Sequence, residues 1–185
     1  MKRLFDLFLS VILLILLLAP ILVIGFLVKI TAKGKVLYWS ERVGVLGNFQ
    51  MPKFCTMKAE TPQLATHLLK NPDEYLTVIG KFLRSTSLDE LPQIWSVLVG
   101  KMSFVGPRPA LFNQDDLIKL RIEKGVDKLL PGITGWAQVN GRDELSIADK
   151  VALEVEYLQQ KSFWFDVKIL WLTLLKVLQK DGVSH

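Results

Sequence analysis

The chain has 185 residues, half of them apolar, and its 23 Lys and Arg against 18 Asp and Glu give a formal charge of +5. This length suits one domain with its own core plus an appendage, and it is short for a second full domain. An apolar and basic composition favours an anionic membrane surface or phosphorylated substrates as partners. With one cysteine, Cys55, and two histidines, His67 and His185, an internal disulfide is excluded and a Cys/His metal cluster is not expected. A bound metal would be a hard cation held by carboxylates, such as Mg²⁺.

The first hydrophobic segment, 7–28, contains no charged residue, and its roughly 33 Å as a helix would cross a hydrocarbon core. Pro20 lies inside it and predicts a kink or break, because proline removes a backbone hydrogen bond. Lysines and arginine flank both ends, which favours both ends staying in the cytoplasm. A kinked spanning helix and a re-entrant helix that bends at Pro20 both fit. A secretory signal fits less well, since no A-x-A cleavage site follows.

The remainder reads as one continuous domain without repeats or a low-complexity linker. Short strands are predicted over 36–39 and 48–54, with a turn marked by Gly44 and Gly47. Helices are predicted by periodicity and capping signals over 62–69, 76–83, 89–98, 113–124 and 146–160. Two stretches rich in Gly, Pro and Arg, 103–111 and 131–143, are interpreted as loops. Such loops suit close backbone approach and charge pairing with phosphate.

The last apolar segment, 162–180, is interrupted by charges and is a poor candidate to span a membrane. As a helix it places its polar side chains on one half: Asp166, Lys168, Thr173, Lys176, Gln179 and Lys180. Trp164 and Trp171 on the other half suit a helix in the lipid headgroup layer. An ordinary core helix would show the same stripe, so both interpretations stay open.

The stretch STSLDELPQ, 85–93, sets two acids side by side, Asp89 and Glu90. A structural interpretation is a helix start, with Ser87 and Glu90 as a capping box or Asp89 as the N-cap. A chemical interpretation uses the same position, because an acid held ionised at a helix N-terminus can attack phosphorus. Glu90 would then bind a metal, and Arg84 and Arg108 would clamp the phosphates.

Several segments in order resemble the bacterial sugar transferase family, the small monotopic phosphoglycosyl transferases that start glycan assembly on a polyprenyl phosphate. The most specific run is LDELPQ, then MSFVGPRP, then PGITGWAQVNGR; ERVGVLGNF, KFCTMK and SFWFDVKIL also match. The resemblance covers nearly the whole chain and implies an α+β, mainly helical fold with a small amount of strand. Residues 1–32 would form a re-entrant membrane helix broken near Pro20. Residues 33–185 would form a compact cytoplasmic catalytic domain with interfacial amphipathic helices, among them 162–180.

The resemblance also implies a two-step reaction at the cytoplasmic face of the bacterial inner membrane. Asp89 would attack the β-phosphate of a UDP-sugar and release UMP, and the phosphosugar would then pass to undecaprenyl phosphate or a similar polyprenyl phosphate. Glu90 would bind Mg²⁺ and Arg108 would bind phosphate. This would be the first membrane step of O-antigen, capsule, exopolysaccharide or glycoprotein glycan assembly. The expected partners are the donor, the lipid acceptor and the bilayer, with no nucleic acid and with a homodimer left open.

The sequence departs from the family pattern at four positions. Cys55 and Leu130 stand where basic residues are common, and Glu154 and Glu156 stand where an Asp and a Tyr are more usual. These departures make three further residues less secure as phosphate- or substrate-binding residues: Lys53, Arg142 and Asp166. Trp136, in PGITGWAQ, either stacks on a substrate ring or packs in the fold.

Two alternatives to the covalent mechanism stay open. In the first, transfer is direct and Mg²⁺-dependent, with Asp89 as a base or a second metal ligand. In the second, the chain is a membrane-anchored nucleotide- or lipid-binding protein without turnover. No residue pattern identifies the sugar, the glycan pathway or the oligomeric state.

Overall fold

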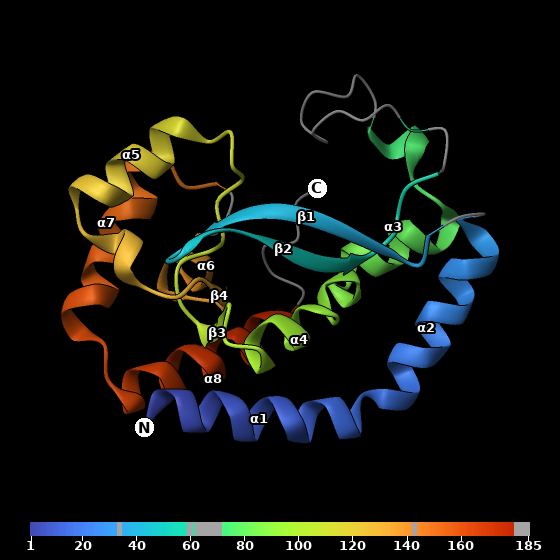
Figure 1. The fold of residues 1–185 in the computed structure, drawn as a ribbon, viewed down its shortest axis with the longest axis horizontal. Coiled ribbons are helices and arrows are strands. Elements are labelled where there is room, and N and C mark those ends of the chain that lie inside the picture. The colour runs from blue at the N-terminus through green and yellow to red at the C-terminus, as the bar shows by residue number, and fades with distance from the viewer. Residues whose placement is uncertain (33–34, 59–60, 62–71, 142–143, 180–185) are drawn as a thin grey trace.

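The computed structural model describes residues 1–32, 35–58, 61, 72–141 and 144–179 (Figure 1). Its elements are mostly helices, with two small two-stranded sheets. The α+β, mainly helical class is therefore confirmed. The helix predicted over 62–69 and the candidate site residue Arg142 lie outside the described residues.

The N-terminal hydrophobic segment forms two helices, α1 (Lys2–Leu16) and α2 (Leu18–Thr31), which meet at Leu17 at an angle of 62° (Figure 1). The break comes three residues before Pro20, because this proline has no N–H to bond the carbonyl one turn earlier and its ring crowds that turn. No single helix among the described residues has the length and apolarity to cross a bilayer, whereas this bent pair together has both.

The first sheet is a hairpin of β1 (Leu37–Gly44) and β2 (Gly47–Phe54), paired antiparallel from Leu37 opposite Phe54 to Gly44 opposite Gly47. Gly47 has φ of 103°, in the left-handed region that favours glycine, and so closes a two-residue turn. The predicted strands and turn are confirmed. β1 is longer than predicted, because pairing with β2 extends it to the turn.

The second sheet corrects the interpretation of both Gly- and Pro-rich stretches as loops. β3 (Ser103–Val105) and β4 (Gly132–Thr134) pair in parallel, and a short helix, α6 (Trp136–Val139), follows. A Cβ on Gly132 would lie 2.1 Å from the backbone nitrogen of Gly106. The two backbone segments can therefore approach this closely only because residue 132 is glycine. Three-residue strands carry too little periodicity to be read from sequence.

The remaining helices include the predicted ones over 76–83, 113–124, 146–160 and 162–180, with small shifts at their ends, and two 3₁₀ helices over 72–75 and 126–128 that were not predicted. They are η2 (Pro72–Tyr75), α3 (Val78–Ser85), η3 (Leu88–Glu90), α4 (Gln93–Leu98), α5 (Asp115–Glu123), η4 (Val126–Lys128), α7 (Ile147–Gln160) and α8 (Phe163–Gln179). The one helix predicted over 89–98 is a 3₁₀ turn, η3, followed by α4. Ser146 caps α7 by accepting a hydrogen bond from the Asp149 N–H at 3.1 Å.

The main core lies where β2, α4, β3, α6, α7 and α8 meet. Its buried side chains are Phe49, Met51, Val97, Met102, Phe104, Val105, Val139, Tyr157 and Ile169. Helix α1 packs against α4 and β3 at the edge of this core. The core therefore ties the first residues of the chain to the last helix.

Polar side chains at the start of α1 hold this apolar helix to the domain. Lys2 Nζ lies 2.5 Å from Asp166 Oδ2 and donates to the Tyr157 hydroxyl at 3.2 Å. Asp6, buried, accepts from the Ser103 hydroxyl at 2.8 Å and from the Phe104 N–H at 3.2 Å. Arg3 donates to two carbonyls at the end of α4. These side chains, Lys2, Arg3, Asp6, Tyr157 and Asp166, are called the α1 anchor cluster below.

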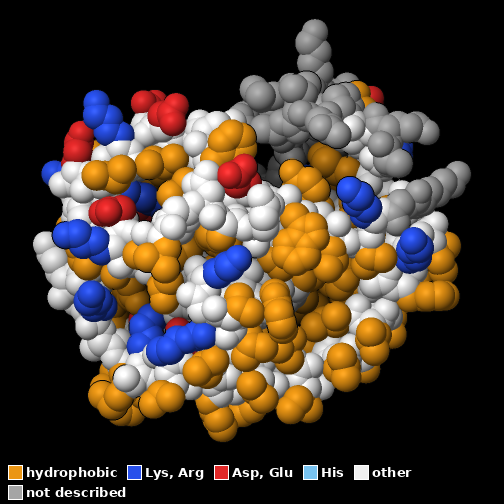
Figure 2. Space-filling view, in the orientation of Figure 1, with side chains coloured by type: hydrophobic (Ala, Val, Ile, Leu, Met, Phe, Trp, Pro, Cys, Tyr) orange, Lys and Arg blue, Asp and Glu red, His pale blue; other side chains and the backbone are white. Residues whose placement is uncertain are grey.

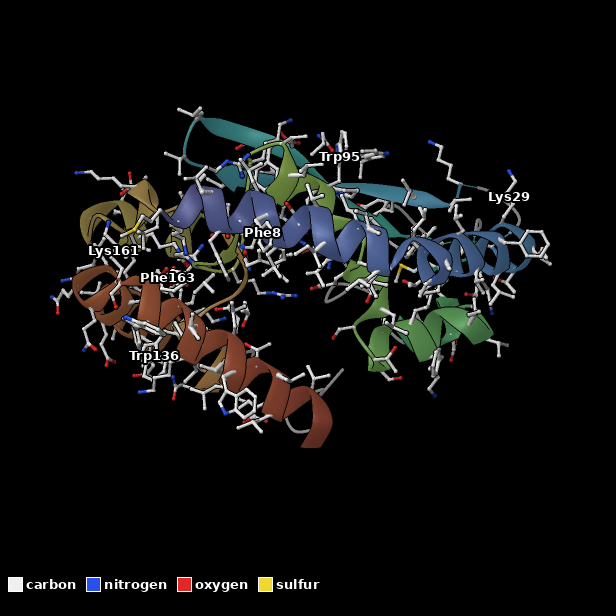
Figure 3. The ribbon with its side chains drawn as sticks, turned by 90° about the horizontal axis from the view of Figure 1, so that it is seen from below. Phe8, Lys29, Trp95, Trp136, Lys161 and Phe163 are labelled. Atoms are coloured by element: carbon white, nitrogen blue, oxygen red, sulfur yellow. The ribbon has the colours of Figure 1, made fainter. Side chains whose placement is uncertain are left out.

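Large apolar side chains on α1, α2 and α8 remain exposed. Figure 2 shows those of α1 and α2 gathered along the lower and right edges of the molecule, while most Asp and Glu side chains in this view lie at the upper left. Phe8 on α1 is 67% exposed, and Trp164 and Trp171 on α8 are 77% and 60% exposed. Helices α1 and α8 both lie on the underside (Figure 3), where the rings of Phe5 and Phe163 meet at 5.4 Å.

Part of the polar half of α8 faces inward, opposite to an ordinary core helix. Asp166 is buried in the α1 anchor cluster, and Thr173 shares a 2.7 Å hydrogen bond with Thr134 of β4. Trp164 and Trp171 point outward instead. This orientation favours the interfacial interpretation of the segment 162–180.

Candidate active site

The acidic pair lies in η3, between α3 and α4. Ser87 ends the preceding turn with φ of 56°, and its side chain makes no capping bond. The N-cap of α4 is Pro92. Both capping interpretations are therefore wrong, and Asp89 sits in a tight turn where it is only 8% exposed. Burial of a carboxyl without a capping bond needs another explanation.

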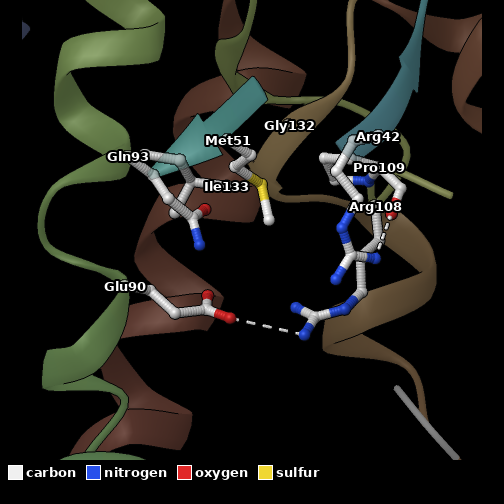
Figure 4. A pocket seen from close by; sticks show the side chains of 8 residues that line it. All are labelled: Arg42, Met51, Glu90, Gln93, Arg108, Pro109, Gly132 and Ile133. Carbon is white, nitrogen blue, oxygen red and sulfur yellow. Dashed lines mark hydrogen bonds and ion pairs between the residues drawn. The ribbon is translucent and has the colours of Figure 1, made fainter. Parts of the chain in front are cut away.

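Glu90 is the meeting point of cations from other segments. Lys53 of β2 lies 2.6 Å from Glu90 Oε1. Arg108, in the loop after β3, lies 3.4 Å from the same oxygen, as Figure 4 shows. The Glu90 and Lys53 side chains are 14% and 17% exposed, so water screens this contact only in part.

Arg42 of β1 is a site residue that reasoning from the sequence did not single out. It donates to the Pro109 carbonyl at 3.2 Å and to the Ser40 hydroxyl at 3.1 Å, and it faces the same hollow as Arg108 (Figure 4). It lies in the ERVG segment that carries part of the family resemblance. Only the course of the hairpin in the folded chain places Arg42 at the hollow that Glu90 also lines.

Arg42, Lys53, Asp89, Glu90 and Arg108 are called the active-site cluster below. A small hollow here holds about 10 Å³, the space of about one water. Its lining residues are Arg42, Met51, Glu90, Gln93, Arg108, Pro109, Gly132 and Ile133 (Figure 4). A phosphate oxygen fits this space, whereas the rest of a nucleotide would lie outside its mouth.

Burial raises the pKa of Asp89 above 3.8, and the negative charge of Glu90 adds to this shift, while Lys53 and Arg84 oppose it. This corrects the expectation that a helix dipole keeps the carboxyl ionised, since η3 has only three residues. Burial, with the neighbouring charge of Arg108, also lowers the pKa of Arg42 to about 10, against the opposing effect of Glu90. An anion bound near both arginines would offset the electrostatic cost of burying the charge of Arg42.

The structure brings together most of the predicted site residues. Arg84 of α3 donates to the Thr56 hydroxyl at 3.0 Å and is near enough to lower the pKa of Asp89. Asp166 instead belongs to the α1 anchor cluster, and Arg142 lies outside the described residues. The roles of these residues in binding and catalysis stay predictions.

Trp136 packs within the fold rather than lining the hollow. Its indole N–H donates to Glu156 at 2.9 Å, its ring lies 5.0 Å from that of Phe165, and Lys168 Nζ lies 5.4 Å from its centroid. Glu156 therefore has a structural partner. The packing interpretation of Trp136 accounts for all these contacts.

Two further departures from the family pattern, Glu154 and Cys55, also have partners within the fold. Glu154 forms a buried, two-pronged ion pair with Arg121, joining α7 to α5. Cys55 is partly buried, and its thiol lies 3.7 Å from the Met57 carbonyl.

The acidic pair fits Mg²⁺ only together with a substrate. In the part of the chain that the structure describes, no group of three or more His, Cys, Asp or Glu side chains could hold a metal. Mg²⁺ at phosphate-transfer sites often takes one or two carboxylates and completes its shell with phosphate oxygens and water. Asp89 and Glu90 supply that number. The ion would compete with Lys53 and Arg108 for Glu90.

Comparison with known proteins gives a match over almost the whole chain. The family model described as bacterial sugar transferase matches residues 1–180. An uncharacterized sugar transferase of Bacillus subtilis (strain 168), EpsL, is 41% identical over 189 residues, covering 100% of this chain and 91% of that protein.

Two longer relatives have named activities. The UDP-glucose:undecaprenyl-phosphate glucose-1-phosphate transferase of Escherichia coli (strain K12) is 40% identical over 95% of this chain and 40% of its own length. The undecaprenyl-phosphate galactose phosphotransferase of Salmonella typhimurium is 35% identical over 98% of this chain and 41% of its own length. The chain thus spans about two fifths of these two relatives.

Proposed function

Because the chain belongs to the bacterial sugar transferase family, we propose that it transfers a phosphosugar from a UDP-sugar to a polyprenyl phosphate and releases UMP. The observation that carries this proposal is the active-site cluster. Glu90 contacts Lys53 and Arg108 and lines the hollow together with Arg42. The adjacent Asp89 is buried, and the positive charges of Lys53 and Arg84 lower its pKa against the effect of burial. Phosphoryl transfer needs such an arrangement, because a carboxylate can approach a phosphate only where its charge is compensated.

In the first step, a carboxylate oxygen of Asp89 forms a bond to the β-phosphorus. The bond from that phosphorus to the bridging oxygen breaks, and UMP leaves with the electron pair. In the second step, an oxygen of the polyprenyl phosphate attacks the same phosphorus and releases the Asp89 carboxylate, giving a polyprenyl diphosphate sugar. The burial of Asp89 supports this role, because a poorly solvated carboxylate is a stronger nucleophile, and Lys53 and Arg84 favour its ionised form.

The cations hold the donor. Arg42 and Arg108 line the same side of the hollow, opposite Glu90 (Figure 4), and suit the non-bridging oxygens of a diphosphate. Mg²⁺, when bound with the donor through Glu90, supplies further charge neutralisation at the phosphates. Lys53 holds the Glu90 carboxylate in place through their 2.6 Å ion pair.

The N-terminal helices give the proposed membrane placement. The 62° bend and the basic residues at both ends suit a re-entrant helix pair, residues 1–32, whose ends stay on the cytoplasmic face of the inner membrane. The exposed Trp164 and Trp171 of α8 suit the headgroup layer. The catalytic domain, residues 33–185, would then lie against the membrane where the lipid acceptor resides.

Mass spectrometry of the intact protein tests the covalent mechanism. The detergent-purified protein is mixed with Mg²⁺ and a panel of UDP-sugars without lipid acceptor, then digested and mapped. We expect one sugar phosphate added to the peptide that contains Asp89, for one donor, and no adduct in Asp89→Asn. Asp115→Asn, an exposed acid at the start of α5, is the matched control and should keep the adduct.

Two other results would revise the proposal. UMP release only in the presence of polyprenyl phosphate, with no adduct, would support direct transfer with Asp89 as base or metal ligand. No UMP release with any donor, with or without lipid acceptor, would overturn the transferase proposal.

A further inference from the structure

A second hollow is larger than the charged one and entirely apolar. It lies between the bent helix pair, the hairpin and α4, and its volume is about 450 Å³, within the range of about 300–1,000 Å³ of ligand pockets. Every lining residue is apolar, among them Leu22, Gly25, Trp39, Phe54, Pro92 and Trp95. We call it the apolar groove.

The apolar groove and the charged hollow share a wall. Met51 lines the charged hollow and Pro52 the groove; in the same way Gln93 lines the hollow and Pro92 the groove. At each of these two places, a single peptide bond separates a residue that lines the hollow from one that lines the groove. A ligand with a charged end and a flexible apolar chain can occupy both by turning round this wall.

Two large aromatic side chains at the groove are only half covered. Trp39 is 50% and Trp95 is 53% exposed, and they come from β1 and α4, not from the membrane-facing helices. Unpaired apolar surface of this kind marks a binding site. The groove opens inside the bend of α1 and α2, whereas Phe8 and Trp171 lie on outer surfaces.

We infer that the apolar groove binds the first isoprenoid units of the lipid acceptor, with the acceptor phosphate at the mouth of the hollow beside Arg42 and Arg108. This inference rests on the proposed function, which supplies a phosphate joined to an apolar chain. The pairing of an anion site with an adjoining apolar groove complements that chemistry at both ends. Acyl chains of bulk lipid and a helix of a second copy are the competing occupants.

Gly25 keeps the groove open. A Cβ at this position would meet Val36 and Phe54 at 3.6 and 3.7 Å, which are ordinary contacts, and the residue is helical. A larger side chain can therefore be introduced without backbone strain, and its outer atoms would fill the groove. Gly25→Leu is thus a blocking variant, and Trp39→Ala and Trp95→Ala are widening variants.

The kinetic test separates the two substrates in lipid nanodiscs. We expect Gly25→Leu and Trp95→Ala to raise KM for polyprenyl phosphate about tenfold, while KM for the UDP-sugar changes by less than about twofold. Ile122→Ala removes an exposed apolar side chain of α5, away from both hollows, and should change neither constant. Equal rises in both KM values, or the same effect from Ile122→Ala, would overturn the inference.

Photocrosslinking tests the groove without turnover, so it decides the inference even if the proposed function fails. A polyprenyl phosphate with a diazirine on an early isoprenoid unit is irradiated with the full chain in nanodiscs. Adducts on the peptides with Trp39 and Trp95, displaced by unlabelled polyprenyl phosphate but not by added phosphatidylglycerol, are the expected result. Adducts mainly on the peptide with Trp164 and Trp171, or groove adducts displaced equally by phosphatidylglycerol, would overturn it. If the peptides with Trp39 and Trp95 are protected from crosslinking only when the protein is dimeric, a second copy occupies the groove, and this result would also overturn the inference.

Discussion

The two charged clusters of this protein, each of which contains a buried acid, differ in the ratio of cations to carboxylates. In the α1 anchor cluster, two cations, Lys2 and Arg3, accompany two carboxylates, Asp6 and Asp166, and each has hydrogen-bond partners within the protein. In the active-site cluster, three cations surround two acids, and one of these, Asp89, has a raised pKa.

This difference separates a structural role from a chemical one. A balanced cluster with satisfied hydrogen bonds stabilises one arrangement and has no need of a ligand. A cluster with excess positive charge keeps a cost of burial that a bound anion can offset. Burial alone does not distinguish the two clusters, whereas the ratio of cations to acids does.

The largest expected effect is that of Asp89→Asn. We expect UMP release to fall by at least about 10³-fold, because the nucleophile is lost. The free energy of unfolding at pH 7 should not fall, since the change removes a carboxyl whose ionisation is disfavoured by burial. UMP release and thermal unfolding measured on one preparation check both. A variant that keeps a tenth of the activity would remove Asp89 from the chemistry.

Removing one site cation should cost less. Arg42→Gln is expected to lower kcat/KM for the UDP-sugar by about 10²-fold, as for other groups that stabilise transition-state charge. Lys119→Gln, an exposed lysine of α5, removes the same charge away from the site and is the matched control. Similar losses in both variants would mean that only the overall charge matters.

The pH dependence follows from the raised pKa of Asp89. Only the ionised carboxyl attacks, so UMP release should fall about tenfold per pH unit below that pKa, at a higher pH than for an ordinary aspartate. The folded state holds this proton more tightly than the unfolded state. Its contribution to stability is therefore present at low pH and is lost as pH rises through the folded-state pKa.

Rate and unfolding profiles over the same pH range check this sign. Activity should increase where this stability contribution is lost, and Asp89→Asn should abolish that contribution. An acid limb at the pKa of a free aspartate would contradict the raised value.

The α1 anchor cluster should respond in stability and not in chemistry. Asp6→Ala leaves the Ser103 hydroxyl and the Phe104 N–H without their acceptor, at about 1–3 kcal/mol for each buried group. Activity per folded molecule should stay within about twofold. Denaturant unfolding in detergent measures the loss of stability, with Glu123→Ala, at an exposed position, as the control. A specific loss of kcat with unchanged stability would place Asp6 in the catalytic machinery.

Local patterns predicted the elements that depend on near neighbours. The hairpin turn, the start of α7 and the break near Pro20 follow from glycine, capping serine and proline at single positions. Other features could not be read this way. The 3₁₀ turn at Asp89 and the strands β3 and β4 are short, and a three-residue segment has too few positions to show a period.

The sequence by itself determined the helical class, the apolar N-terminal segment and the adjacent acids with their downstream arginine. Only the tertiary structure decided that Lys53 contacts Glu90 and that Arg42 lines the same hollow, that Asp166 serves as an anchor, and that an apolar groove adjoins the site. The physical reason is the distance along the chain over which each effect acts. Propensity, capping and proline geometry act over a few residues, whereas the pKa of Asp89 and the shape of the groove arise from segments that meet only when the whole chain has folded.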